Sequence, residues 1–115
     1  MNLNPKFKDF EKEIGIEVEQ DEYSGTNGIY FIFQYEDERG ALFGDNKPLE
    51  DTCYIQLKLY TPKDFNYFEL KKNTRDYFES SGFFISSIFT YLENVTINAD
   101  KMRCTVFKLE YTDEH

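Results

Sequence analysis

Residues 52–84 constrain the fold most, because they predict a strand, a turn, a helix and a second strand in immediate succession. Apolar and polar residues alternate over 52–60, which is the pattern of a strand with one buried face. The Thr-Pro-Lys-Asp sequence at 61–64 favours a turn into an amphipathic helix. Gly82 then supplies the left-handed conformation with which many helices end. The stretch therefore predicts an α+β protein in which a helix covers a sheet.

The predicted helix has candidate caps and one face suited to burial. Asp64 or Asn66 can cap it, because a short side-chain oxygen accepts a hydrogen bond from a free amide of the first turn. The side chains of the buried face recur at spacings of three and four residues: Tyr67, Leu70, Thr74, Tyr77 and Phe78. Phe83, just beyond Gly82, is expected to pack back on the last turn.

The rest of the chain predicts one more helix and three more strands. Asn4 is a candidate cap for a helix that ends near Gly15. Apolar and polar residues alternate over 16–19, 29–38 and 102–111, and each of these segments predicts a strand. Ser86-Ser87 interrupts the strand over 83–92, where a bulge or a sheet edge is expected. The order is α-β-β-β-α-β-β. We expect a single, mainly antiparallel sheet of four to five strands with two helices on one face, and a parallel pair is allowed only across the second helix.

Length and charge narrow the class of protein. A chain of 115 residues forms one domain with a single core, here rich in Phe. The net charge of −9 comes without a compact basic patch, so neither nucleic acid nor an anionic membrane surface is an expected partner. No apolar run approaches the roughly 20 residues that a bilayer span needs, and the N-terminus has no signal-peptide core. These features predict a protein made in the cytoplasm.

No residue pattern points to a reaction, a metal or a cofactor. Cys53 and Cys104 lie in predicted strands without Cys or His companions, and we interpret them as reduced core thiols; a disulfide would need Cα atoms within about 7 Å. The single histidine, His115, lies in the tail over 112–115, which is expected to fray. Carboxylate neighbours such as Glu36 and Glu38 are expected by chance among 22 acids. We therefore expect a binding protein, not an enzyme.

Residues 37–51, DERGALFGDNKPLED, predict a long flexible loop, because two glycines, an Asp-Asn pair and a proline interrupt regular structure. Loops of about fifteen residues in compact domains are usually functional or disordered. Leu42 and Phe43 stand near its middle. These two apolar residues either tuck onto the domain or wait for a partner, and the sequence leaves both readings open.

Several segments of the sequence resemble those of the tail-terminator and tail-completion (head-tail joining) proteins of long-tailed phages that infect Gram-positive bacteria. They are the aromatic strand IYFIFQYEDERGALFGDNKPLED, then CYIQLKLYTPKDF, the helix end ESSGFF, and the closing strand CTVFKLEYTDE. Together they span most of the chain from about Gly28 to Glu114. None of them is a catalytic signature.

The resemblance implies a structural role in a phage or prophage virion. Such subunits assemble as a ring, usually hexameric, on the last layer of the tail tube, where the ring stops polymerisation and offers a docking surface to the head. The implied partners are further copies of this chain, the major tail tube protein and a head-completion or connector protein, and the implied location is the virion tail. The loop between the second and third strands would make contacts through residues of its length: Arg39, Leu42, Phe43, Asp45 and Lys47. Because a ring needs two different faces on each subunit, an exposed edge strand is the second candidate surface.

Two alternatives remain. An acidic immunity or inhibitor protein would mask the basic cleft of a nuclease-type toxin, and a charge of −9 would speed that association. The dense acids over residues 11–22 are consistent with it. A head-completion protein of the same virion is the other alternative.

Overall fold

The computed structural model describes residues 1–44, 47–94 and 101–114, with side chains for all of these except 38–50 and 114. It confirms the predicted α+β class and the order α-β-β-β-α-β-β. The elements are α1 (Asn4–Ile14), β1 (Val18–Gln20), β2 (Tyr30–Gly44), β3 (Lys47–Pro62), α2 (Phe68–Ser80), β4 (Phe84–Asn94) and β5 (Lys101–Glu114).

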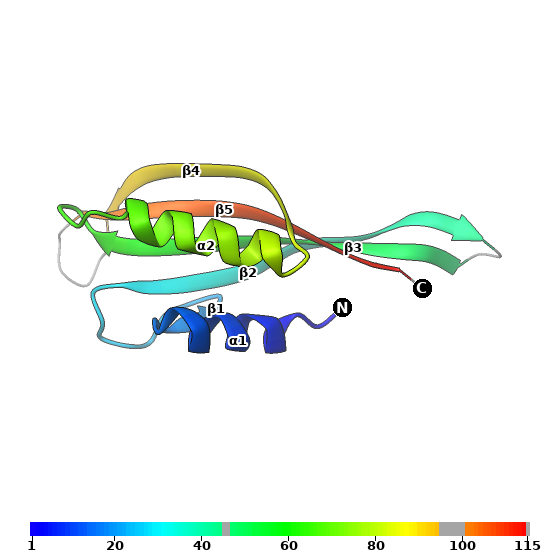
Figure 1. Ribbon diagram of the computed structural model, residues 1–115, viewed down its shortest axis with the longest axis horizontal. Coiled ribbons are helices and arrows are strands. Elements are labelled where there is room, and N and C mark those ends of the chain that lie inside the picture. The colour runs from blue at the N-terminus through cyan, green and yellow to red at the C-terminus, as the bar shows by residue number, and fades with distance from the viewer. Residues whose placement is uncertain (45–46, 95–100, 115) are drawn as a thin grey trace.

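The five strands form one sheet in the order β1-β2-β3-β5-β4 (Figure 1). All neighbours are antiparallel except β1 and β2, which are parallel. The sequence allowed a parallel pair only across the second helix, and this prediction is wrong. β3 and β4 do run in the same direction, but β5 lies between them and pairs with both. The parallel pair is instead made by the short β1, whose chain crosses back through residues 21–29 before entering β2.

Both helices pack on one face of the sheet, as predicted, and this face is called the helix side. Phe78 of α2 lies 5.6 Å from Phe7 and 4.8 Å from Phe10, both of α1, between ring centroids. Phe7 in turn stacks on Phe33 of β2 at 4.1 Å. The predicted strand faces are confirmed, because the odd-numbered side chains of the long strands point into this core: Phe31, Phe33, Cys53, Ile55, Leu57, Leu59, Phe107 and Leu109.

α2 begins and ends nearly as its sequence predicts. Neither predicted residue occupies the cap position, which Tyr67 holds without a side-chain cap bond. Asn66, one residue earlier, does contact the first turn, because its Oδ1 accepts a hydrogen bond from the Phe68 amide at 3.3 Å. Gly82 has a φ of 88°. This left-handed turn brings the Phe83 amide to the Phe78 carbonyl at 3.0 Å and buries the Phe83 side chain. Thr74 and Phe78 are buried on the predicted face, and Leu70 and Tyr77 pack beside them.

The start of α1 differs from the prediction. Asn4 is the first helical residue, and Leu3, which is buried, occupies the cap position. The Asn4 side chain instead joins two strands: its Oδ1 accepts from the Tyr35 hydroxyl at 2.6 Å, and its Nδ2 donates to Gln20 Oε1 at 3.1 Å. The Leu3 amide donates to the Tyr35 hydroxyl at 2.9 Å. These bonds tie the start of α1 to β1 and β2, which local sequence could not show.

The predicted loop over residues 37–51 is wrong. β2 runs to Gly44 and β3 begins at Lys47, so residues 37–44 and 47–51 form the far half of a long hairpin, while residues 45 and 46 lie outside the described part of the chain. Register shifts beside Gly40 and between Leu42 and Phe43 accommodate the irregular sequence within the ladder. Pairing satisfies backbone amides and carbonyls without requiring an alternating apolar pattern, which explains why periodicity failed here. We call residues 37–44 and 47–51 the hairpin arm.

The predicted fraying of residues 112–115 is wrong for 112–114, while His115 lies outside the described residues. β5 continues to Glu114 and pairs with β3 at Thr52, Asp51 and Glu50. The base of the hairpin arm is therefore a three-stranded ribbon. The protein measures 54 × 26 × 22 Å, and the hairpin arm extends beyond both helices along the long axis (Figure 1).

Both cysteines are buried, as predicted. Cys53 belongs to the helix-side core, whereas Cys104 belongs to the cluster on the opposite face. The two thiols therefore lie on different sides of the sheet.

Truncating Phe78 should destabilise the protein far more than truncating Phe68, which lies on the same helix. Phe78 is fully buried and Phe68 is 64% exposed. We expect Phe78→Ala to lower the free energy of unfolding by about 3–5 kcal/mol. Phe68→Ala should change it by less than about 0.5 kcal/mol. Urea denaturation measures both, and equal losses would contradict this packing.

Candidate functional site

The face opposite the helices, called the open side, carries a cluster of tyrosines. The rings of Tyr23 and Tyr30 stack at 3.9 Å, and those of Tyr30 and Tyr60 stack at 5.0 Å. Tyr30 and Tyr60 are buried together with Cys104 and Val106. The connection over residues 21–29 supplies Tyr23 and so closes one end of this cluster.

Acidic side chains near the N-terminus hold that connection in place. Glu17 accepts hydrogen bonds from the Tyr23 hydroxyl and from Nδ2 of the Asn27 side chain. Glu19 accepts from both the amide and the hydroxyl of Ser24. Glu11 accepts from the Val18 amide at 2.8 Å, which joins α1 to β1. Three of the acids over residues 11–22 thus serve the chain's own structure.

Burial shapes the protonation of the tyrosine cluster. It raises the pKa of Tyr60 well above the ordinary range, and the neighbouring Cys104 and Glu93 side chains add to the effect. The pKa of Tyr30 is raised for the same leading reason. Burial also raises the pKa of the Cys104 thiol. A thiol held in its protonated form is a poor nucleophile, so this cluster is built for packing and not for covalent chemistry.

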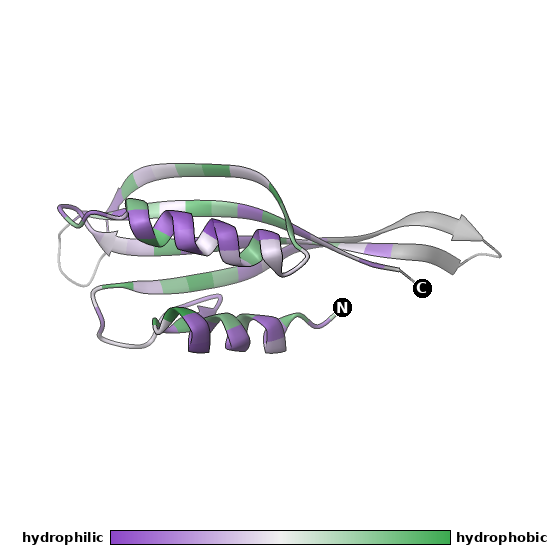
Figure 2. Ribbon diagram, viewed as in Figure 1, coloured by the Kyte–Doolittle hydropathy of each residue, from purple (hydrophilic) through white to green (hydrophobic). Residues whose placement is uncertain are grey.

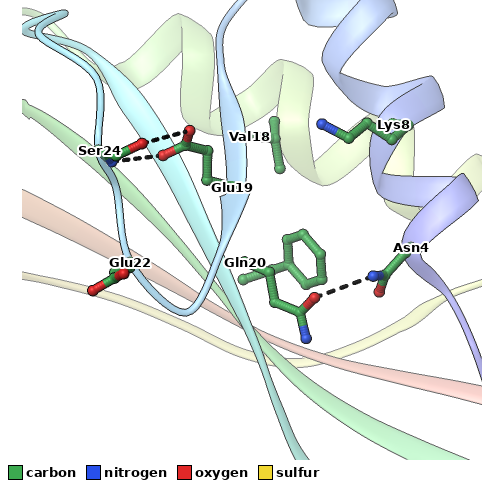
Figure 3. Close-up of a pocket in the computed structure, with 8 residues that line it drawn as sticks. Asn4, Lys8, Val18, Glu19, Gln20, Glu22 and Ser24 are labelled. Carbon is green, nitrogen blue, oxygen red and sulfur yellow. Dashed lines mark hydrogen bonds between the residues drawn. The ribbon is translucent and has the colours of Figure 1, made fainter.

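Two shallow hollows lie beside α1. The first, about 390 Å³, lies between α1 and β1 (Figure 3) and is lined by Asn4, Lys8, Val18, Glu19, Gln20, Glu22, Ser24 and Phe33. In it the Asn4 side chain bonds Gln20, and the Glu19 carboxylate is occupied by Ser24. The second, about 380 Å³, lies between the helices and is lined by Phe10, Glu13, Ile14, Asn73, Asp76, Tyr77 and Ser80.

In the second hollow, the Asp76 carboxylate has partners within the chain. Lys72 lies 2.8 Å from Asp76 and lowers the pKa of that carboxyl group, with a contribution from Arg75. Several polar groups of the two hollows are thus bonded to neighbouring residues, and we assign no reaction to either.

Within the described ranges, no group of three or more His, Cys, Asp and Glu side chains is placed to hold a metal ion. Over the same part of the chain, no helix has the length and apolar character needed to cross a membrane.

The apolar surface that stands out lies on β4, the last strand of the sheet. Phe84 is 65% exposed, Phe89 45%, Leu92 41% and Tyr91 38%. Figure 2 shows hydrophobic residues along this strand at the sheet edge. The predicted irregularity at Ser86-Ser87 is confirmed as a register shift between Ile85 and Ser87, beyond which β4 pairs regularly with β5.

The structure brings most of the predicted interface residues to the far end of the hairpin arm. Leu42 and Phe43 lie in β2, where Leu42 pairs with Glu50 and Phe43 with Pro48, and Lys47 opens β3 opposite Gly44. Arg39 lies nearer the body, opposite Thr52. Asp45 lies outside the described residues.

The β4 side chains were not among the predicted site residues. A signal was present in the sequence, because residues 84–92 are rich in aromatic and aliphatic residues and carry no charge. That composition is equally typical of a central strand, and only the strand order reveals that β4 is an edge.

No family model matches this chain, and no curated protein matches its sequence.

Stability should fall as the pH rises above about 10, because buried tyrosines must then lose their protons against a raised pKa. The ordinary tyrosine pKa is about 10, and burial raises the pKa values of Tyr30 and Tyr60 above it. The pKa of Tyr91, which is 38% exposed, is raised to about 12. A raised folded-state pKa gives stability that is complete below the unfolded value and is lost as the pH climbs toward the folded value. Urea denaturation from pH 8 to 12 measures the loss.

Tyr60→Phe removes one hydroxyl whose pKa is strongly raised in the folded protein. The stability of this variant should therefore decline less steeply above pH 10 than that of the unmodified protein. Identical pH slopes for the two proteins would show that Tyr60 ionises as freely in the folded state as in the unfolded state.

Proposed function

We propose that this chain is a structural protein of a phage or prophage, a tail terminator whose copies form a ring on the last layer of the tail tube. The ring stops polymerisation of the tube and offers the head a docking surface. The observation that supports this proposal best is the hairpin arm, which extends beyond the helices where the sequence resemblance implies a projecting contact segment (Figure 1).

The hairpin arm is suited to a contact role because its base is ordered by strand pairing and side-chain bonds. The Thr52 and Thr112 hydroxyls lie 3.0 Å apart where β3 meets β5. Glu36 of β2 and Lys108 of β5 form an ion pair at 2.9 Å across the sheet. Exposed ion pairs contribute little stability, but the three paired strands limit how far the hairpin arm can swing. A contact surface that is already ordered loses less entropy on binding.

A closed ring of identical subunits joins one face of each copy to a different face of the next. The hairpin arm supplies one such face, with Leu42, Phe43 and Lys47 toward its end and Arg39 nearer the body. The ring is hexameric in the proteins that the sequence resembles. Its other partners would be the major tail tube protein and a head-completion or connector protein, and its place would be the virion tail.

The charge distribution supports a structural subunit over the acidic inhibitor. Glu11, Glu17 and Glu19 are engaged in hydrogen bonds within the chain, so this acidic segment has a role in the fold itself. The net charge of −9 would also repel DNA from the ring's inner wall and so ease its passage. We propose no catalytic role and no cofactor.

Inactivating the gene in the phage or prophage that carries it should yield overlong tails without heads. An unterminated tube continues to grow, and electron microscopy of the induced lysate measures its length. Tails of normal length beside detached heads would indicate a head-completion protein instead. Intact virions would refute a structural role and favour the inhibitor.

Replacing Leu42 and Phe43 together by Ser should abolish ring assembly and leave the melting temperature nearly unchanged. The backbone pairs of these residues with Glu50 and Pro48 do not require the apolar side chains. The matched control replaces Phe65 and Phe68, two exposed apolar residues outside the hairpin arm, by Ser. Complementation of the inactivated phage compares the two variants. A large loss of melting temperature in the first would show that its side chains belong to the core.

A further inference from the structure

Among the described strands, none pairs with the outer edge of β4. It is the last strand in the order and pairs on one side with β5. Proteins usually guard such edges with lysine, proline, very short strands or bulges. Residues 84–92 contain no charged residue and no proline, and the one register shift lies near the start of the strand, before Ser87. From Ser87 to Leu92 the edge is regular and unguarded.

The side chains of this regular stretch alternate between the two faces of the sheet. Phe89 pairs with Val106 and Tyr91 with Cys104, which places both rings on the open side. Ile88 pairs with Phe107 and Thr90 with Thr105, which places them on the helix side, as does the register for Leu92. Both faces of the edge therefore offer apolar side chains to a further strand.

The stretch is complementary to itself. If a second copy of β4 lies antiparallel with Thr90 opposite its own counterpart, residues facing each other have numbers that sum to 180. Phe89 then faces Tyr91 on the open side, and Ile88 faces Leu92 on the helix side. Ser87 faces Glu93, so no acid faces an acid. Aromatic and aliphatic cross-strand pairs of this kind stabilise antiparallel sheets.

Registers shifted by two residues lose this match. With Phe89 opposite itself, Tyr91 would face Ser87 and Leu92 would face Ser86. With Tyr91 opposite itself, Phe89 would face the Glu93 carboxylate. The register centred on Thr90 is thus the one that pairs every apolar residue from Ile88 to Leu92 with an apolar partner or with its own counterpart.

We infer that two copies of this chain associate through antiparallel pairing of their β4 strands, with Thr90 at the two-fold axis. The partner strand comes from a second copy because the side chains of the β4 edge are complementary to those of an identical strand. In addition, two chains that each carry a net charge of −9 repel each other least through an uncharged segment, and residues 84–92 carry no charge. The pairing joins the two five-stranded sheets into one.

The area of contact indicates a reversible dimer. Phe89, Tyr91 and Leu92 are 38–45% exposed, and large side chains of this kind bury roughly 150–250 Å² each, so two copies cover about 500 Å² of apolar side chain. Stable interfaces bury about 1,600 Å² in total, and backbone edges must supply the rest. Association should therefore depend on concentration.

This pairing goes beyond the ring proposed above and does not rest on it. The β4 contact joins the same patch of two copies, whereas ring formation joins two different patches, so each can fail while the other stands.

Sedimentation of the purified chain from low micromolar to near-millimolar concentration, combined with disulfide trapping, tests the pairing. Residues directly opposite in an antiparallel pair have Cα atoms about 4.5–5.5 Å apart, within the range that a disulfide spans. Thr90→Cys should therefore give a covalent dimer on mild oxidation. Ser87→Cys is the matched control on the same strand, because the two Ser87 positions would lie about 20 Å apart. The natural cysteines are buried and should stay reduced.

A monomer–dimer equilibrium, together with cross-linking of Thr90→Cys well above that of Ser87→Cys, supports the inference. Phe89→Glu should then shift the equilibrium to the monomer, with circular dichroism to verify folding. A monomer at every concentration overturns it, and so does equal cross-linking of the two cysteine variants. A hexamer that does not cross-link through Thr90→Cys would refute β4 pairing and leave the ring proposal intact.

Discussion

The fold depends on a group of phenylalanine rings between the helices and the sheet. Phe7 and Phe10 of α1 both contact Phe78 of α2, and Phe7 also stacks on Phe33 of β2. These contacts hold together elements that are far apart in the sequence. Because both helices meet at Phe78, the position of one sets the position of the other, and the opposite face of the sheet remains without a helix.

The hairpin arm follows a different principle from this core. The core is held by burial of apolar side chains, whereas the arm's described structure is a backbone ladder that runs on past the helices. The end of β5 joins that ladder as a third strand, so residues that read locally as a loop and a frayed tail support each other. Each segment alone offers a weak signal, and their pairing satisfies the backbone groups of both.

The surfaces on which the proposals rest lie at the margins of the sheet and not in a cavity. The hollows beside α1 are shallow, and several of their polar groups already have partners within the chain. The hairpin arm instead extends paired strands beyond the helices, and the β4 edge presents exposed apolar side chains. Such surfaces suit a protein that acts by joining others. The two proposals assign them different contacts. The arm joins different patches of neighbouring copies, and β4 joins identical patches of two copies.

The sequence by itself determined the elements whose signals are local. Alternation predicted the buried faces of β2, β3 and β5, spacing predicted the buried face of α2, and Gly82 predicted its end. Only the tertiary structure decided that β5 separates β3 from β4 and that Asn4 joins strands instead of capping α1. It also decided that the candidate contact residues it describes lie on paired strands: Arg39, Leu42, Phe43 and Lys47. The reason is that strand neighbours and side-chain partners are chosen between segments distant in sequence. The residues next to a given position in the sequence do not determine which distant segment it pairs with.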